Sequence, residues 1–289
     1  MKPVIRKLLP NETRTPDQLY RDYEIEKELT ERLRRSSKAE RAQLYASIYD
    51  ELFRRVPHLT RDKPAAKRQA EVDLQMRLLR PMLGTDATFV EIGPGDCALA
   101  FTVAGHVRHV YAVDVSVEVM KKNPKSPENF ELILSDGSSL PVPPESVDVV
   151  YSNQMMEHLH PDDVANQLRS VYAALKPGGI YLCVTPNRLN GPHDISRYFD
   201  RVATCLHLKE YTFGELLALF RGAGFTKVKA YIGGRGRYFA FPVVPIIWLE
   251  NILSHLPERV RIPLAENPLG SGVLGIRLAG RKNVRRAST

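Results

Sequence analysis

The sequence has few cysteines, no long hydrophobic run and no internal repeat. Its three cysteines, Cys97, Cys183 and Cys205, are odd in number and widely spaced, which argues against a disulfide framework and for a reducing compartment. The apolar part of residues 1–10 is too short for a signal peptide. The most apolar stretch, residues 238–249, is too short and too interrupted by proline to span a bilayer. These absences predict a cytoplasmic protein.

The protein is basic. The chain has 289 residues, with 41 Lys and Arg against 33 Asp and Glu, which gives a formal net charge of +8. Many arginines stand beside glutamates near the N-terminus, and a second basic group closes the chain at Arg277, Arg281, Lys282, Arg285 and Arg286. Because a basic surface alone specifies little, we favour solvated helix faces over a nucleic-acid site. Attraction to an anionic membrane surface is a third interpretation of the same charge.

Two parts differ in their hydrophobic pattern. Residues 1–84 are predicted to form a helical extension. From residue 85, strands alternate with helices, which predicts an α/β fold with a Rossmann-like sheet of seven mostly parallel strands, the last one antiparallel. Two insertions, at about 187–209 and 233–270, are expected to form a lid, because long connections in a compact domain usually serve function. The expected strands lie near 87–92, 108–114, 130–135, 146–152, 180–185, 226–232 and 273–280.

The most informative segment is 89–98, an apolar strand that turns through two glycines into a helix. Gly93 and Gly95 let the backbone pass close under a ligand, because neither residue has a Cβ. The following helix presents its first N–H groups to the same place. Glu91 adds a negatively charged acceptor there. A nucleoside with a cationic arm suits such a site better than a pyrophosphate does.

Four motifs resemble, in order and position, those of class I S-adenosylmethionine (SAM)-dependent methyltransferases: Glu91-Ile-Gly93-Pro94-Gly95, Val113-Asp114, Asp136-Gly137 and Leu175-Lys-Pro-Gly-Gly179. The resemblance implies that Asp114 holds the ribose hydroxyls and that Asp136 contacts the adenine amino group. The family's third glycine is Cys97 here, a small residue with which we expect binding to survive. The implied cofactor site contains Glu91, Gly93, Pro94, Gly95, Asp114, Val115, Asp136, Gly137, Ser138, Asn153 and Gln154.

Three other functions compete with this interpretation. A nicotinamide-dependent dehydrogenase is one, because residues 93–98 also satisfy G-x-G-x-x-A; Glu91 argues against it, since its carboxylate would face pyrophosphate charge. A SAM-binding sensor or partner subunit without catalysis stays open, because no residue is a required nucleophile. RNA methylation is disfavoured, because the Asn/Asp-Pro-Pro-aromatic motif of base-amine methyltransferases and the Pro-Cys pair used on pyrimidine carbon are absent.

Methyl transfer to oxygen also needs a proton acceptor. The sulfonium already carries an activated methyl group, so the protein supplies mainly alignment and exclusion of water, whereas a hydroxyl acceptor must lose its proton. His158, just past the fourth expected strand, is the candidate base; the alternative is that Glu157 and His158 cap the next helix. His193 is a second candidate. Tyr45 and Tyr49 either cover the cofactor or pack in the core.

Residues 152–159 also resemble the Glu-x-x-Glu-His of ubiquinone-pathway O-methyltransferases, whose acids and histidine are associated with a divalent ion. Gln154 replaces the first acid, so we expect no metal.

Together these features predict a small-molecule methyltransferase with a small or lipid-like acceptor and oxygen as the favoured atom. Residues 238–249 either line an acceptor pocket, contact a membrane together with the basic tail, pair two subunits or pack inside the lid.

Overall fold

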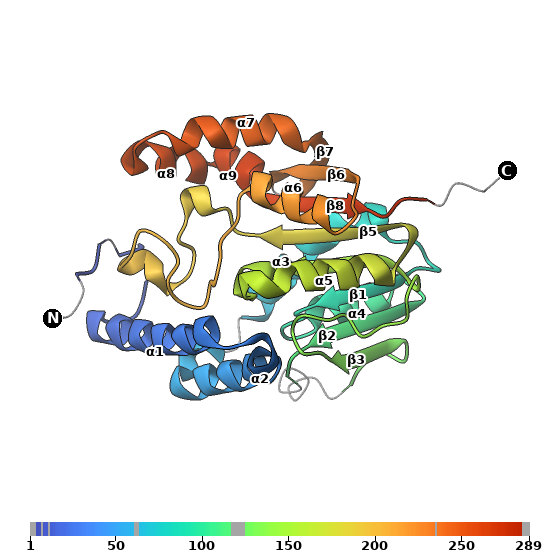
Figure 1. The fold of residues 1–289 in the computed structure, drawn as a ribbon, viewed down its shortest axis with the longest axis horizontal. Helices are drawn as coiled ribbons and strands as arrows, with labels where there is room; N and C mark the ends of the chain where they lie inside the picture. The colour runs from blue at the N-terminus through green and yellow to red at the C-terminus, as the bar shows by residue number, and fades with distance from the viewer. Residues whose placement is uncertain are drawn as a thin grey trace.

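The computed structural model describes residues 4–6, 8–10, 12–60, 64–116, 125–234 and 236–284. An eight-stranded sheet runs through this part of the chain in the order β3-β2-β1-β4-β5-β8-β6-β7 (Figure 1). Neighbours from β3 to β5 pair in parallel, and the pairs β5–β8, β8–β6 and β6–β7 are antiparallel. The strands are β1 (Thr88–Ile92), β2 (His109–Asp114), β3 (Phe130–Leu134), β4 (Val147–Asn153), β5 (Leu175–Thr185), β6 (Lys227–Gly234), β7 (Arg237–Pro242) and β8 (Ile276–Arg281).

The predicted α/β fold is confirmed, including the antiparallel last strand, but the expected number of strands was too low. Seven strands overlap the predicted ranges, although β5 already begins at Leu175, in the segment expected to be a turn, and β7 is the additional strand. β7 pairs with β6, and two glycines near their connection have positive φ values: Gly233, near the end of β6, with 131°, and Gly236, just before β7, with 78°. Its residues follow no clear alternation of apolar and polar side chains, so the hairpin was hidden inside the expected lid.

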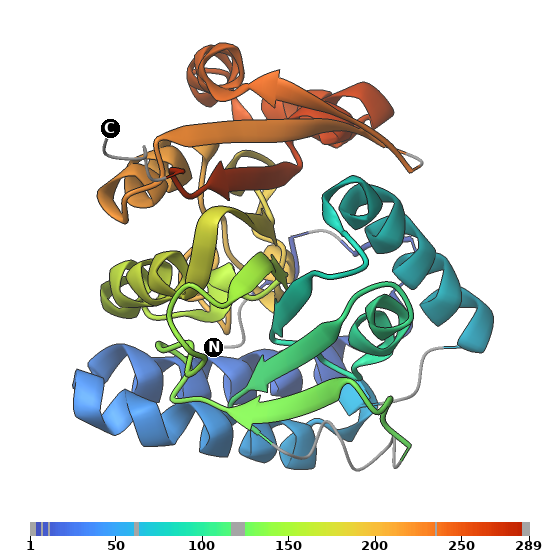
Figure 2. The same ribbon diagram turned by 90° about the vertical axis from the view of Figure 1, so that its right-hand side faces the viewer.

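Helices cover both faces of the sheet (Figure 2). Side chains alternate along β1, so Phe89 enters the apolar core under α3 and α4, and Val90 enters the core under α5 and α6. The longer helices are α1 (Pro16–Arg35), α2 (Lys38–Arg55), α3 (Ala65–Leu79), α4 (Ala98–Ala104), α5 (Pro161–Ala174), α6 (Phe213–Gly222), α7 (Val243–Ser254), α8 (Glu258–Glu266) and α9 (Pro268–Leu274). Short 3-10 turns are η1 (Pro57–Thr60), η2 (Arg80–Met82), η4 (Met156–His158), η5 (Arg188–Asn190) and η6 (Ile195–Tyr198).

Helices α1 and α2 form a cap beside the β1–β3 half of the sheet (Figures 1 and 2). Both helices begin with a capping box, in which Thr15 pairs with Gln18 and Ser37 pairs with Glu40. Helices α7, α8 and α9 lie at the opposite, β7 end of the sheet (Figure 1). The cap and the C-terminal helices therefore flank the sheet from two ends.

A buried ion pair fastens the cap to the sheet domain. Arg41 on α2 donates to both carboxylate oxygens of Asp163 on α5, at 2.7 and 2.9 Å, and both side chains are at most 3% exposed. The Tyr45 hydroxyl donates to the same carboxylate at 2.9 Å and accepts the backbone N–H of His160, also at 2.9 Å. These bonds fix α2 across the chain that follows β4.

We expect Asp163→Ala to lower the free energy of unfolding by about 3–5 kcal/mol, because it leaves the Arg41 charge buried without its partner. Urea denaturation followed by circular dichroism measures the change. Glu31→Ala is the matched control, since its ion pair with Arg35 is largely exposed and is worth about 1 kcal/mol or less. Equal effects of the two substitutions would show that the Arg41 pair does not hold the cap.

Candidate functional site

The turn after β1 is built on close backbone contacts. Gly93 has φ +68° and donates its N–H to the Val113 carbonyl at 2.9 Å. A Cβ at Gly93 would lie 3.1 Å from Cγ of Met155, in the segment after β4, so the position has little room for a side chain. Cys97 also adopts a left-handed conformation, with φ 58°, at the start of α4. This conformation explains why a glycine suits the third position of the motif.

Glu91 lies under this turn with a buried carboxylate. The side chain is 4% exposed, and its Oε2 has no hydrogen-bond partner within the described part of the chain. The backbone N–H of Ala100 bonds to the carboxyl group, but burial raises the pKa of Glu91 well above its usual value. A buried carboxylate with an unpaired oxygen is costly unless a cation or a donor reaches it. The observation fits a ligand with a positively charged arm.

Two further acids stand at the ends of β2 and β3. One oxygen of Asp114 accepts the N–H groups of Val115 at 2.7 Å and Ser116 at 3.1 Å, which orients the carboxylate. Burial raises the pKa of Asp114. Asp136 uses its Oδ1 within its own turn, accepting from the backbone and hydroxyl groups of Ser138 and Ser139. Burial opposes ionisation of Asp136, but these hydrogen bonds prevail and lower its pKa.

The structure brings the residues of the implied cofactor site to one edge of the sheet. The ends of β1, β2, β3 and β4 meet there because these strands are parallel. Gln154 is exposed, has φ +54° and donates its backbone N–H to the Val184 carbonyl at 2.8 Å. The binding roles of these residues stay predictions. Among the remaining members, Pro94 and Gly95 follow β1, Gly137 follows β3, and Asn153 is the last residue of β4.

The cap closes over this edge with two tyrosines. Tyr45 is 3% exposed and lies so close to Gly137 that a Cβ there would sit 2.8 Å from its ring, while Gly137 has φ +82°. Tyr49 makes an edge contact with the His158 ring at 6.0 Å between centroids. Burial raises the pKa of Tyr49, and the charges of Glu157 and Asp114 act in the same direction. Tyr49 therefore stands between the acid after β2 and the segment after β4.

His158 is neutral and its tautomer is fixed. Its Nδ1 lies 3.0 Å from the Leu206 carbonyl, which can only accept, so Nδ1 carries the proton and Nε2 has the lone pair. Burial lowers the pKa of His158 to about 3. The next helix, α5, is capped by His160, whose Nδ1 accepts the Asp162 N–H at 3.3 Å. The structure therefore gives the capping role to His160 and not to Glu157 or His158.

Glu157 and His207 complete a buried group with His158. Glu157 is 0% exposed, accepts the Thr185 hydroxyl at 2.9 Å, and has a pKa that burial raises to about 7. His207 bonds through Nδ1 to Glu210 at 2.8 Å. Burial lowers the pKa of His207, but the Glu210 hydrogen bond and nearby acidic charge outweigh it, so the pKa is raised.

His193 lies close by but is held within its own link. Its Nε2 is 3.1 Å from the Asn187 carbonyl, and its backbone N–H donates to Glu210 at 2.7 Å. Glu210 thus joins His193 to His207. Sequence reasoning missed Glu210 and also Glu26 of α1, which faces His207 across the cap. The three-residue spacing of His207 and Glu210 could have predicted their contact. No local sequence pattern indicates that Glu26 lies near this site.

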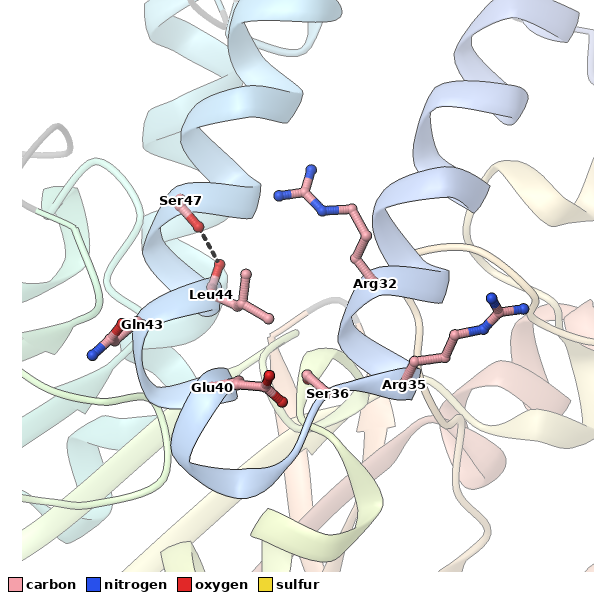
Figure 3. A pocket seen from close by; sticks show the side chains of 7 residues that line it. All are labelled: Arg32, Arg35, Ser36, Glu40, Gln43, Leu44 and Ser47. Atoms are coloured by element: carbon pink, nitrogen blue, oxygen red, sulfur yellow. Dashed lines mark hydrogen bonds between the residues drawn. The ribbon is translucent and has the colours of Figure 1, made fainter.

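A separate hollow of about 690 Å³ opens between α1 and α2 (Figure 3). Arg32 and Arg35 border it from α1, and Glu40 and Leu44 border it from α2. Ser47 donates to the Leu44 carbonyl within its own helix at 3.0 Å. None of the predicted site residues lines this hollow, so it lies outside the candidate site.

Comparison with known proteins finds similarity to methyltransferases over part of the core. Residues 90–183 match the family described as "Methyltransferase domain". A Mycolicibacterium smegmatis protein named a probable S-adenosylmethionine-dependent methyltransferase is 31% identical over 158 residues, which cover 55% of this chain and 58% of that protein. The demethylmenaquinone methyltransferase of Listeria welshimeri is 27% identical over 187 residues, covering 56% of this chain and 78% of that protein. This chain therefore spans little more than half the length of the first of these relatives.

The fold has solved counterparts. A chain in the solved complex that contains the Haloferax volcanii Trm112 methyltransferase activator superposes with a TM-score of 0.53. The match is 15% identical in sequence and covers 75% of this chain and 92% of that chain. At this identity the likeness concerns the fold alone.

The pH dependence of stability at Glu26 tests how strongly the α1–α2 cap buries the carboxyl group of this residue. Burial raises its pKa to about 8, whereas an exposed glutamate titrates near 4.5. The folded protein therefore holds this proton more tightly than the unfolded chain, so the stabilisation is complete below pH 4.5 and is lost as the pH rises through 8.

We expect Glu26→Gln to gain stability relative to the unmodified protein as the pH rises from 4.5 to 8, by up to about 5 kcal/mol. Urea denaturation at several pH values measures the difference. Glu31→Gln, at a half-exposed position on the same helix, should show no such trend. A pH-independent difference for Glu26→Gln would mean that its carboxylate is solvated.

Proposed function

We propose that this protein, which carries a methyltransferase domain at residues 90–183, transfers a methyl group from SAM to a small or lipid-like acceptor, with oxygen as the methylated atom. One observation carries the proposal: the buried Glu91 carboxylate, with its unpaired oxygen, lies under the glycine turn at the same sheet edge as Asp114. A sulfonium nucleoside with an ammonium group has complementary charge there.

The residues present fit this cofactor. Glu91 would hold the cationic arm, Asp114 the ribose hydroxyls, and the turn at Gly93 and Gly95 would let the backbone approach. SAM supplies the activated methyl group when it is bound. The cap excludes water, because Tyr45 and the ion pair behind it seal the ends of β3 and β4.

We assign His158 as the proton acceptor for a hydroxyl group, a role that its lowered pKa of about 3 allows only when a neighbouring negative charge stabilises the protonated ring. It follows β4, as Met155 does, and Met155 packs against Gly93 of the cofactor turn. Nε2 of the His158 ring carries no proton and has an available lone pair, because the ring proton is on Nδ1, which donates to the Leu206 carbonyl. The preference for oxygen rests on His158. The name of the demethylmenaquinone methyltransferase relative favours a small-molecule acceptor.

An apolar outer surface on α7 supports contact with an anionic membrane. Val244, Trp248 and Ile252 repeat every four residues and are 52%, 70% and 65% exposed. The net charge of +8 favours an anionic surface. Arg285 and Arg286 of the basic tail lie outside the described residues. In the ranges that the structure describes, no helix combines the length and apolarity that crossing a bilayer requires.

Two variants separate binding from turnover. Asp114→Asn should weaken SAM binding about 10- to 100-fold in titration calorimetry, because it removes the negative charge from the group proposed to accept the ribose hydroxyls. His158→Gln should leave that affinity unchanged and lower transfer of a labelled methyl group to a hydroxyl acceptor about 100-fold. Glu131→Gln, an exposed control on β3, should change neither.

The two variants can also contradict the proposal. Unchanged SAM affinity in Asp114→Asn would remove the ribose role, and full turnover in His158→Gln would remove the proton acceptor. SAM binding without transfer to any member of an acceptor panel of phenols, quinols, amines and lipids would indicate a binding protein without catalysis.

We expect the double variant Trp248→Ser, Ile252→Ser to bind vesicles of phosphatidylglycerol and phosphatidylcholine at least about tenfold less tightly, because it removes two exposed apolar anchors. Cosedimentation measures the binding. Val202→Ser is the control, since Val202 is 60% exposed but lies in the link before α6. Loss of a dimer in sedimentation, with unchanged vesicle binding, would show that this surface pairs two subunits instead.

A further inference from the structure

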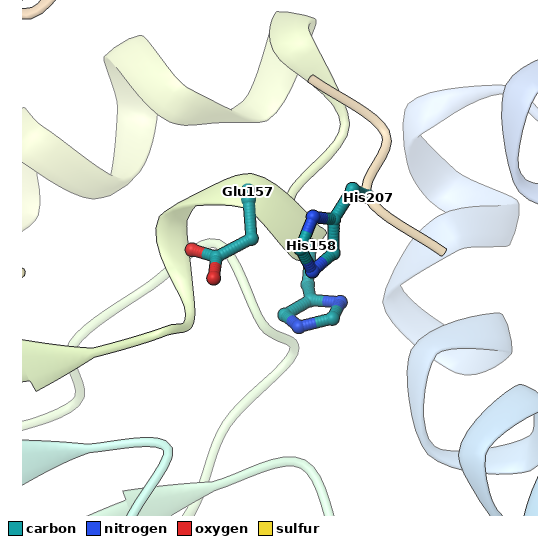
Figure 4. A group of neighbouring side chains, drawn as sticks. All are labelled: Glu157, His158 and His207. Carbon is teal, nitrogen blue, oxygen red and sulfur yellow. The ribbon is translucent and has the colours of Figure 1, made fainter. Parts of the chain in front are cut away.

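Glu157, His158 and His207 form a compact group of three potential metal ligands. One oxygen or nitrogen from each residue lies within 4.8 Å of the other two. Glu157 and His158 belong to the short turn η4, and His207 reaches them from a separate segment of chain (Figure 4). The rings of His158 and His207 meet edge to face, 4.9 Å apart between centroids.

In each residue a hydrogen bond holds one polar atom and leaves the other available. Nδ1 of His158 donates to the Leu206 carbonyl and Nδ1 of His207 bonds to Glu210, so both Nε2 atoms remain. In Glu157, Oε2 accepts the Thr185 hydroxyl, while Oε1 is buried and has no partner among the residues described. Histidines that bind metals are usually oriented in this way, by a carbonyl or carboxylate on the opposite ring nitrogen.

We propose that Glu157, His158 and His207 bind a divalent transition-metal ion of the zinc and iron(II) class. Two imidazole nitrogens and one carboxylate oxygen, with further positions open, form a ligand set that these ions accept. Magnesium prefers a set of oxygens and is disfavoured here. The inference rests on the proposed function and changes one part of it. Nε2 of His158 cannot bind an ion and accept a proton at the same time, so the ion, which would lower the pKa of an acceptor hydroxyl, would promote proton loss in place of His158.

This revises the expectation of no metal that the sequence produced. Gln154, which replaces an acid in the motif, is exposed and does not belong to the group. The third ligand is instead an imidazole from the link after β5. Further acid lies beside the group: Asp194 accepts the backbone N–H of His207 at 3.2 Å, and Glu26 is near enough to interact with His207. Buried acids at this density are stabilised by a cation.

The test measures metal binding without SAM and without an acceptor. The full chain is treated with EDTA, dialysed and titrated with Co²⁺, whose visible spectrum reports nitrogen ligands, and then with Zn²⁺ and Mg²⁺ by calorimetry. We expect one Co²⁺ or Zn²⁺ per chain and a melting temperature that rises with Zn²⁺ but not with Mg²⁺.

Glu157→Gln and His207→Gln should each weaken Zn²⁺ binding at least about 100-fold. His109→Gln, in a partly exposed histidine at the start of β2, is the matched control and should bind as the unmodified protein does. Each variant is melted with and without Zn²⁺, so a folding defect appears in both curves and a lost site only in their difference.

The proposal is overturned if the unmodified protein binds no Co²⁺ or Zn²⁺, if Mg²⁺ binds as tightly as Zn²⁺, or if both ligand variants keep the affinity of His109→Gln. Should a ligand variant not fold, the Co²⁺ spectrum of the unmodified protein decides alone. Titrating the EDTA-treated protein with SAM tests the proposed function separately.

Discussion

The buried pair of Arg41 and Asp163 is the contact on which the closed site depends. It ties α2 to α5, and Tyr45 shares the same carboxylate. With α2 fixed there, Tyr45 covers Gly137 and Tyr49 covers His158. A surface ion pair would contribute little to such an arrangement, but a fully desolvated pair with matched hydrogen bonds imposes one position on the cap.

Burial decides the charge of the groups at this edge of the sheet. Burial raises the pKa of Glu91 and brings that of Glu157 to about 7, and it lowers that of His158 to about 3. Each group is driven toward its neutral form unless an opposite charge arrives. Glu91 and Glu157 both have an oxygen without a partner among the described residues. The site therefore has two places for positive charge, one under the glycine turn and one after β4.

Local sequence was enough to predict the motifs at the ends of the parallel strands. It was not enough to predict which segments pack over them. Gly93 and Gly95 lie in a turn whose conformation depends on neighbouring residues, and Asp114 ends a strand, so these positions could be predicted from local sequence. His207 meets Glu157 only because the link after β5 folds back, and no periodicity records such a contact. The same holds for β7, where glycines marked the turn but the strand lacked alternation.

One helix connects the outer surface with this folded-back link. The inner face of α7 carries Glu250, which is 3% exposed and accepts the Asn187 amide at 2.7 Å and the Phe213 N–H at 3.0 Å. Asn187 begins the link that carries His207, and Phe213 begins α6 just beyond it. Because Glu250 holds both ends of the segment, the position of His207 depends on α7. The helix that presents Trp248 to the outside thus also fixes the chain that reaches Glu157.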